Sequence, residues 1–285
     1  MSVETVSQHA CFDGTVGFYA HESDETKCTM RFAVFVPPQA KAGPVPVLTY
    51  LAGLTCTEET FMIKAGAQRT AAELGLMLVA PDTSPRGDDV PGDPDGGWDF
   101  GHGAGFYLDA SEAPYAANYR MYSYITRELR QLIQSHFPAR AERQGIFGHS
   151  MGGHGALTLG VKNPDIYASI SAFAPICAPM NCPWGEKALL RYLGSHQETW
   201  AAYDASQLIA SLARDEAHQR PALLVDQGMN DPFLESQLHP HLLENACSEV
   251  GMSLTLRHHA GYDHGYYFIS TFMEDHLRHH AAALT

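Results

Sequence analysis

The sequence of 285 residues is poor in positive charge. Lys and Arg number 18 against 32 Asp and Glu, which gives a formal net charge of −14. Proteins bind nucleic acids and anionic membranes through basic surfaces, so this composition argues against nonspecific binding to either. It does not exclude an anionic small-molecule substrate, because a pocket can be locally positive in an acidic protein.

Long apolar runs and paired metal-binding motifs are also missing. No stretch approaches the roughly 18 consecutive apolar residues of a membrane-spanning helix, and the first residues lack the basic and apolar segments of a secretion signal. The six cysteines are widely spaced without a Cys-x-x-Cys pair, and no His pair has zinc-site spacing. We therefore expect reduced thiols, a cytoplasmic location, no membrane contact and no metal.

The hydrophobic pattern predicts a single α/β domain over residues 1–285, with helices on both faces of a mostly parallel sheet. Short β-rich runs alternate with helical stretches, and strand followed by helix, repeated, favours parallel pairing with right-handed crossovers. Residues 14–21 and 28–38 have no helix between them, which predicts an antiparallel hairpin before the parallel sheet. The expected strands are residues 30–37, 46–53, 76–82, 145–150, 169–175, 222–228 and 253–260, and the expected helices are 61–75, 122–137, 152–163, 232–251 and 266–280.

One long segment, residues 83–114, shows neither pattern. It is rich in Gly and Pro, so it could be a plain surface loop. It also carries Trp98, Phe100, Phe106 and Tyr107, more aromatic residues than a linker needs. We favour a structured loop near an active site.

The strongest local motif is Gly148-His149-Ser150-Met151-Gly152, which matches Gly-x-Ser-x-Gly. It follows an expected strand and opens an expected helix, as a nucleophile elbow requires. Glycine at both flanks lets the backbones approach closely, and the helix N-terminus directs N–H groups at developing negative charge. A glycine-rich helix start with a capping serine is the alternative, but the context favours Ser150 as a nucleophile.

A nucleophilic serine needs a base and an acid, which follow it in the order acid then His in this fold type. His264 lies just after the last expected strand and is our candidate base; His258 and His259 fall within that strand and are taken as structural. Asp226 and Asp231 compete as the acid. We favour Asp231, because a loop residue can reach sideways to His264 better than a strand residue can.

The oxyanion of the reaction needs two backbone N–H donors. One is expected from Met151, the residue after the nucleophile, and the other from Leu54, in the loop after residues 46–53. Cys56 lies two residues further and is therefore expected near the site. The alternative is that it is simply a small buried residue of the core.

These motifs resemble the S-formylglutathione hydrolase family, in the esterase D group of α/β-hydrolases. The resemblance covers nearly the whole chain and rests on seven segments: LAGLTCTEETF, PDTSPRG, the long stretch WDFGHGAGFYLDA…PYAANYRMYSYITREL, GHSMGGHGAL, FAPICAPMNCPWGEKAL, DQGMNDPFL and GYDHGYYFISTFMEDHLRHHA. The long stretch is far more specific than the serine motif. It implies the α/β-hydrolase fold, a triad of Ser150, Asp231 and His264, an oxyanion hole at Leu54 and Met151, no cofactor, and a cytoplasmic homodimer. In the family an acidic residue commonly precedes the catalytic Asp; here that position is Asn230.

The family resemblance implies hydrolysis of S-formylglutathione to glutathione and formate. A general short-chain carboxylesterase acting on oxyesters is the alternative, since it would share every catalytic residue. Glutathione carries two carboxylates and one ammonium, so its site needs local donors and aromatic walls. We expect these from the residues adjoining the site, which are Cys56, Trp98, His149, Trp184 and Lys187.

Overall fold

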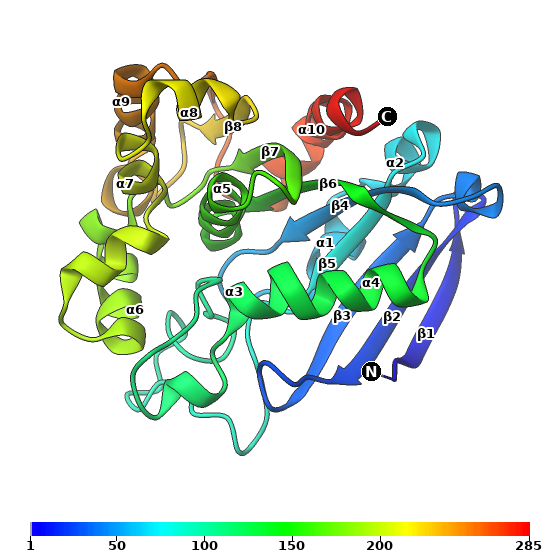
Figure 1. Cartoon of the computed structure of the whole chain (residues 1–285), viewed down its shortest axis with the longest axis horizontal. Helices are drawn as coiled ribbons and strands as arrows, with labels where there is room; N and C mark the ends of the chain where they lie inside the picture. Colours follow the sequence, from blue (N-terminus) through cyan, green and yellow to red (C-terminus); the bar gives the residue numbers. More distant parts are fainter. Residues whose placement is uncertain (1) are drawn as a thin grey trace.

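The computed structural model describes residues 2–285, which form a nine-stranded sheet with the order β1-β2-β3-β5-β4-β6-β7-β8-β9 (Figure 1). The strands from β5 through β4 to β9 pair in parallel, whereas β1, β2 and β3 pair antiparallel and join β5 antiparallel. The strands are β1 (Glu4–Cys11), β2 (Gly14–Glu22), β3 (Thr29–Val36), β4 (Val45–Leu51), β5 (Met77–Pro81), β6 (Ala139–His149), β7 (Tyr167–Phe173), β8 (Leu223–Gly228) and β9 (Leu254–His259).

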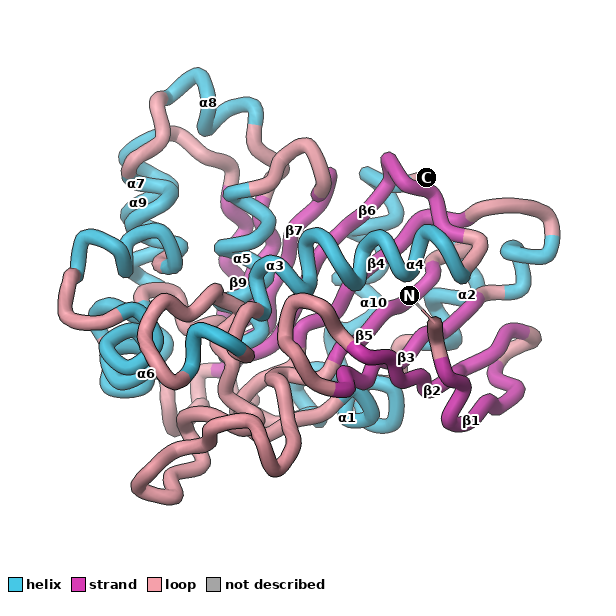
Figure 2. The backbone as a smooth tube through the Cα atoms, turned by 60° about the horizontal axis from the view of Figure 1, so that its bottom comes forward, coloured by secondary structure: helices cyan, strands magenta, loops and turns pink. Residues whose placement is uncertain are grey.

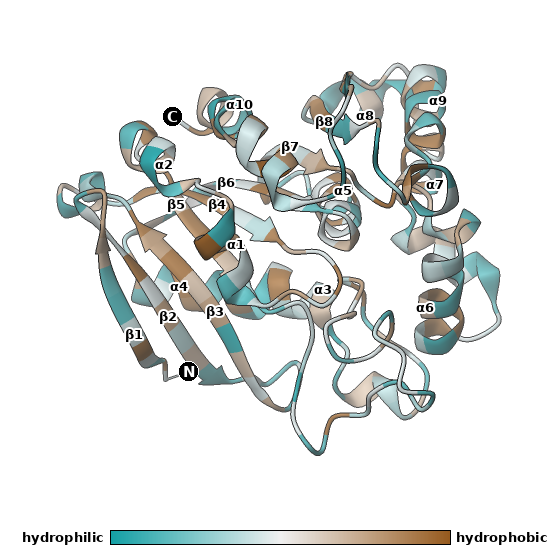
Figure 3. Cartoon of the chain, turned by 180° about the vertical axis from the view of Figure 1, so that it is seen from behind, coloured by the Kyte–Doolittle hydropathy of each residue, from teal (hydrophilic) through white to brown (hydrophobic). Residues whose placement is uncertain are grey.

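The expected N-terminal hairpin is present as β2 and β3, but β1 was not predicted. Its sequence, ETVSQHAC, is mostly polar, and its side chains are largely exposed. It forms a strand because it pairs with β2 at the edge of the sheet, so tertiary pairing replaces the missing apolar pattern. The hydropathy view shows the same contrast between a mainly hydrophilic β1 and the hydrophobic strands of the middle (Figure 3).

Helices cover both faces of the sheet, as expected. Helices α1, α2 and α10 lie on one face, and α4 and α5 on the other, with α7 and α9 packed beyond α5 (Figures 1 and 3). The helices are α1 (Glu58–Lys64), α2 (Gln68–Leu74), α3 (Met121–Ser123), α4 (Arg130–His136), α5 (Met151–Lys162), α6 (Pro183–Leu193), α7 (Ala205–Ala210), α8 (Arg214–Gln219), α9 (Pro240–Val250) and α10 (Tyr266–Leu284).

The expected helix 122–137 contains a π-helical stretch, Tyr124–Leu129, between α3 and α4, and two other expected helices are broken. Residues 61–75 divide at Gly66, whose φ of 67° ends α1 before α2 begins. Residues 232–251 divide at His239, which has φ 47° and separates a π-helical turn from α9. Helices α6, α7 and α8 were not predicted, although the buried residues of α6, from Trp184 to Leu193, recur at helical spacing.

The segment between β5 and the short 3₁₀ turn at Tyr115–Ala117 is irregular, with isolated bridges in place of strands. Its Phe100, Phe106 and Tyr107 are buried as part of the main hydrophobic core, while Trp98 is 56% exposed. The loops of this part of the molecule gather beside α6 (Figure 2). A loop packed in this way has a fixed shape that can form one wall of a site.

Within residues 2–285, no helix is both long enough and apolar enough to cross a membrane.

Candidate active site

Ser150 occupies a sharp turn between β6 and α5. Strand β6 ends at His149, α5 begins at Met151, and Ser150 between them has φ 57° and ψ −120°. A non-glycine residue with positive φ is strained, and such strain concentrates at functional sites. The geometry is that of the strand-to-helix turn expected from the sequence motif.

Close backbone contacts explain why glycine surrounds this serine. A Cβ atom on Gly152 would lie 1.9 Å from the carbonyl oxygen of Leu51, and one on Gly148 would lie 2.2 Å from the carbonyl oxygen of Gly152. Both distances are far shorter than any atomic contact, so neither position accepts a side chain. The contacts bring the start of α5 directly against the end of β4.

His264 is hydrogen-bonded to Asp231. Its Nδ1 lies 2.5 Å from the Oδ2 atom of Asp231, and the second carboxylate oxygen accepts the backbone N–H of Phe233 at 2.8 Å. Asp231 lies in the turn after β8, and His264 lies between β9 and α10, so the ends of two neighbouring strands bring them together. With Nδ1 donating to the carboxylate, the neutral ring keeps its lone pair on Nε2.

His264 also contacts His149, the last residue of β6. The rings of His264 and His149 are 4.4 Å apart, and His149 directly precedes Ser150. His149 is buried, its ring nitrogens have no hydrogen-bond partner among residues 2–285, and burial lowers its pKa well below the usual value. It is therefore neutral at physiological pH, so it places no second positive charge beside His264.

Asp226, the competing candidate, belongs to a different cluster. Its two carboxylate oxygens each lie 2.6 Å from a nitrogen of the Arg257 guanidinium, and His276 lies 3.2 Å away. Burial alone would raise the pKa of this carboxyl, but the hydrogen bonds from His276 and Arg257 hold it well below its usual value. The structure thus brings Asp231 to His264 and gives Asp226 to an ion pair.

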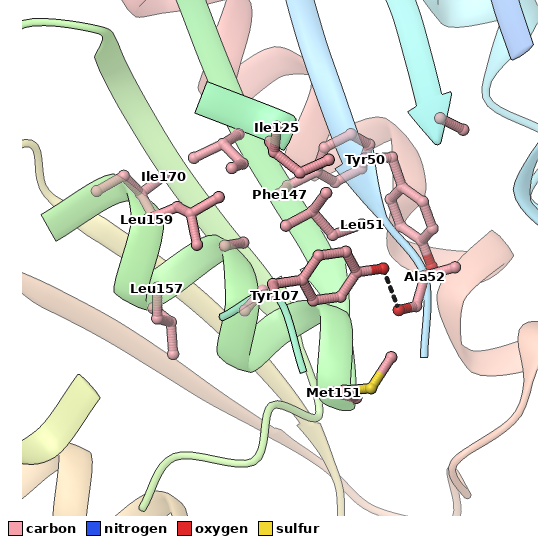
Figure 4. Close-up of a cluster of buried hydrophobic side chains, with 14 of the residues drawn as sticks. Tyr50, Leu51, Ala52, Tyr107, Ile125, Phe147, Met151, Leu157, Leu159 and Ile170 are labelled. Atoms are coloured by element: carbon pink, nitrogen blue, oxygen red, sulfur yellow. Dashed lines mark hydrogen bonds between the residues drawn. The ribbon is translucent and has the colours of Figure 1, made fainter. Parts of the chain in front are cut away.

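The segment with the expected oxyanion donor is held by the long loop. The Tyr107 hydroxyl donates to the carbonyl oxygen of Ala52 at 2.9 Å (Figure 4), and the Thr55 N–H donates to the carbonyl oxygen of Gly103 at 2.9 Å. Leu54 lies between these two anchors, and its N–H makes no hydrogen bond within the described part of the chain. Met151 is the first residue of α5, where N–H groups have no partner inside the helix.

Cys56 lies at the end of the same segment. Its carbonyl oxygen accepts hydrogen bonds from Thr83 at 2.6 Å and from Arg86 at 3.1 Å. Burial raises the pKa of its thiol, against the opposing effects of Thr60 and of the Lys64 charge. The thiol is therefore protonated at neutral pH, which disfavours it as a nucleophile.

Aromatic rings link the long loop to the base. Trp98 and Trp184 are in edge contact at 5.6 Å, Trp184 lies 4.8 Å from Phe233, and Phe233 lies 5.0 Å from His264. The first two rings were expected near the site. Phe233 was missed, although its position two residues after Asp231 could have indicated it.

Lys187 is engaged by two carboxylates of the long loop. Its Nζ lies 2.8 Å from Asp93 and also contacts Asp99. Arg191 binds the other oxygen of Asp93 at 2.6 Å. Although burial opposes it, hydrogen bonding to Lys187 lowers the pKa of Asp93 to about 2. The charge of Lys187 therefore helps hold the loop on α6.

Within residues 2–285, no three His, Cys, Asp or Glu side chains converge as a metal site would require. The site presents a hydroxyl, an imidazole and a carboxylate at the carboxyl ends of the parallel strands.

The chain is similar to known proteins along its full length. The Esterase family model matches residues 23–279. The S-formylglutathione hydrolase of Mus musculus is 51% identical over 285 residues, which is all of this chain and 99% of the mouse protein. The chain belongs to the S-formylglutathione hydrolase family. The Bos taurus member is 50% identical over the same length.

A solved structure extends the match to three dimensions. The S-formylglutathione hydrolase of Agrobacterium tumefaciens is 52% identical, with a TM-score of 0.95 over 99% of both chains. The family resemblance and the α/β fold class predicted from sequence are thus confirmed. As a member of the S-formylglutathione hydrolase family, the chain is a serine hydrolase.

Proposed function

We propose that this chain hydrolyses S-formylglutathione to glutathione and formate, with Ser150, His264 and Asp231 as its catalytic triad. The observation that carries the proposal is the His264–Asp231 hydrogen bond of 2.5 Å beside the strained Ser150 turn. It occurs in a chain about half identical to several S-formylglutathione hydrolases along its full length.

The reaction follows from these groups. The Ser150 hydroxyl attacks the thioester carbonyl while its proton moves to Nε2 of His264, and Asp231 stabilises the imidazolium that forms. The backbone N–H groups of Leu54 and Met151 bind the oxyanion. The tetrahedral intermediate then collapses, the carbon–sulfur bond breaks, and the thiolate of glutathione leaves, taking up the proton from His264.

Hydrolysis of the formyl-enzyme uses the same groups in reverse. Water loses a proton to His264 as its oxygen attacks the formyl carbon, and collapse of the second intermediate returns the proton to Ser150 and releases formate. A thiolate is a good leaving group, so the demand on general-acid catalysis is smaller than for an amide. The steps need no metal or organic cofactor.

The leaving-group side is proposed to lie between the long loop and the start of α10. Trp98, Trp184, His149 and Cys56 would line it, because ring contacts connect the tryptophans, through Phe233, and His149 to His264, and Cys56 lies two residues after Leu54. Half of the Trp98 side chain is exposed, which leaves surface for a peptide to cover.

The site also needs a cation for the peptide carboxylates. Lys187 was expected from the sequence, but it already contacts two carboxylates. Lys64 makes no ion pair within residues 2–285, and its Nζ lies 5.9 Å from the ring centre of Tyr266. Together with Tyr267 and Ser270, these two residues line a hollow near Cys56. We therefore favour Lys64 as the partner of a glutathione carboxylate.

We further propose a cytoplasmic homodimer, as the family resemblance implies. The six cysteines form no disulfide within the described residues, which fits a reducing compartment. Analytical ultracentrifugation would test the dimer.

Substrate preference and one variant test the function. Wild-type kcat/KM should be far higher for S-formylglutathione than for a short aryl acetate, whereas a general carboxylesterase would show the reverse. Ser150→Ala should lower kcat on both substrates by on the order of 10⁴-fold or more with an unchanged circular dichroism spectrum. Near-wild-type activity of the variant would remove Ser150 as the nucleophile.

A further inference from the structure

A buried glutamine touches the proposed acid. Gln227, in β8, is completely buried, and its side-chain NH₂ donates to Oδ2 of Asp231 at 3.3 Å and to the carbonyl oxygen of Gly228 at 2.9 Å. The oxygen it contacts on Asp231 is the one that accepts the hydrogen bond from His264. One carboxylate oxygen is therefore shared between the imidazole and the amide.

The orientation of this amide is determined by its surroundings. Both groups that face the Gln227 nitrogen, the Asp231 carboxylate and the Gly228 carbonyl, can only accept hydrogen bonds at neutral pH. A flipped amide would direct its oxygen at the carboxylate and lose both bonds. The oxygen of Gln227 has no partner among residues 2–285. A buried polar atom left unpaired costs stability, so this side chain is not arranged for stability alone.

We propose that Gln227 is a positioning residue that fixes the Asp231 carboxylate and sets the basicity of His264. The inference rests on the proposed triad. The N–H of Phe233 holds one oxygen of Asp231 and Gln227 helps to hold the other, so the carboxylate is fixed at both ends. His264 then has a single acceptor for its Nδ1 proton.

The other titratable groups near the pair leave this role to Gln227. His149, from β6, faces His264 at 4.4 Å but is neutral. Asp263, on the same loop as His264, accepts the N–H of Gly265 at 2.9 Å. Among the described residues, Asp231 forms an ion pair with His264 only. The amide of Gln227 is thus the side-chain donor that moderates the Asp231 charge felt by His264.

The sign of the effect follows from electrostatics. A donated N–H withdraws charge from Oδ2, so removing it makes the carboxylate more basic and stabilises the protonated imidazole further. In Gln227→Met, which keeps the size of the side chain, we expect the acidic limb of the kcat/KM profile to move up by about half a pH unit. We also expect kcat to fall about tenfold as the carboxylate loses a fixed position.

Two companion variants separate positioning from packing. Gln227→Glu should regain activity as pH falls, because a protonated carboxyl can donate to Asp231 and an ionised one cannot. Gln68→Met is the matched control: Gln68 is also buried, but its amide donates to the carbonyl oxygen of Met62, far from the triad. That variant can lose stability, yet its pH profile should match the wild type.

The pH dependence of kcat/KM on S-formylglutathione would be measured for all three variants, with circular dichroism to confirm folding. A shifted acidic limb in Gln227→Met supports the inference. A wild-type limb and kcat in that variant would overturn it; if that variant fails to fold, a wild-type profile of Gln227→Glu would do so. Asp231→Asn distinguishes a failure of the proposed triad from a failure of the proposed role of Gln227. Full activity of Asp231→Asn would refute the proposed triad itself, whereas its loss beside an unaffected Gln227→Met would refute only the role of Gln227.

Discussion

The hydroxyl of Tyr107 donates a 2.9 Å hydrogen bond to the carbonyl oxygen of Ala52, joining the long irregular loop to the segment that carries Leu54 (Figure 4). Tyr107 has φ 51°, and its ring lies so close to α5 that a Cβ on Gly155 would be 2.6 Å from it. Burial raises the pKa of its hydroxyl well above the usual value, so it stays a donor at neutral pH.

Tyr107→Phe should therefore impair catalysis more than binding. The change removes one oxygen, leaves the carbonyl of Ala52 without its donor, and allows the Leu54 N–H to move from the proposed oxyanion position. We expect kcat to fall about tenfold with little change in KM. Tyr122→Phe is the control, because that hydroxyl binds Asn163 outside the site. Equal kcat values for the two variants would contradict a role of Tyr107 in the oxyanion segment.

Substitution of Asp231 should affect activity, whereas substitution of Asp226 should affect stability. Asp231→Asn should lower kcat strongly at unchanged stability, because His264 loses its orienting carboxylate. Asp226→Asn should instead lower the free energy of unfolding by about 1–3 kcal/mol, since Arg257, which keeps Asp275, and the buried His276 both lose a charged partner. Steady-state kinetics and urea unfolding of both variants measure the difference. The opposite pattern would make Asp226 the acid.

Lys64 and Lys187 should also differ. Lys64→Gln should raise KM for S-formylglutathione about threefold, the effect of one exposed ion pair, and leave a neutral aryl ester unchanged. Lys187→Gln should lower kcat/KM on both substrates, because Asp93 and Asp99 lose a partner that holds the loop on α6. A KM increase confined to the thioester in Lys187→Gln would restore the direct role expected from the sequence.

Stability should fall as the solution is acidified below neutral pH. His154 is completely buried, and its Nε2 lies 3.1 Å from the carbonyl oxygen of Phe106. Burial, only partly opposed by that hydrogen bond, lowers its pKa to about 4. The folded state therefore binds this proton less readily than the unfolded chain does, so the contribution is intact above about pH 6.5 and is lost as pH falls toward 4.

The size of this loss is up to about 3 kcal/mol, from about 1.4 kcal/mol per pKa unit. Urea unfolding between pH 7 and pH 4 measures it, and His154→Gln should flatten the slope by about one proton. His9→Gln, on the exposed β1, is the matched control. An equally steep slope in His154→Gln would assign the acid sensitivity to the other buried histidines.

The sequence predicted most accurately those features that depend on local sterics. The Ser150 turn could be identified because glycine at 148 and 152 is required by backbone contacts a few residues away or with the adjacent strand. The choice of Asp231 over Asp226 followed from a similar argument about reach from a turn. In the structure Asp231 contacts His264, whereas Asp226 is paired with Arg257.

Features that depend on distant partners could not be predicted. Strand β1 exists because β2 offers it a pairing edge, and its own residues carry no apolar pattern. The partners of Lys187 are Asp93 and Asp99, roughly ninety residues away in the chain. The sequence therefore could not show that the Lys187 ammonium is already paired and less available to a substrate. Gln227 lies in the segment DQGMNDPFL, but nothing in that motif assigns it a role, and only its contact with Asp231 distinguishes it.

The strained backbone of Ser150 destabilises the folded protein, and two substitutions at this position can measure by how much. Alanine at this position keeps the left-handed φ of 57° and its strain, whereas glycine adopts that conformation freely. The strain of such a residue is on the order of 1–3 kcal/mol, somewhat more than the entropy that glycine costs in the unfolded chain. Ser150→Gly would then melt at a higher temperature than Ser150→Ala although both lack the nucleophile. The difference in melting temperature between these two inactive variants would measure the backbone strain that the native protein tolerates in order to present its hydroxyl.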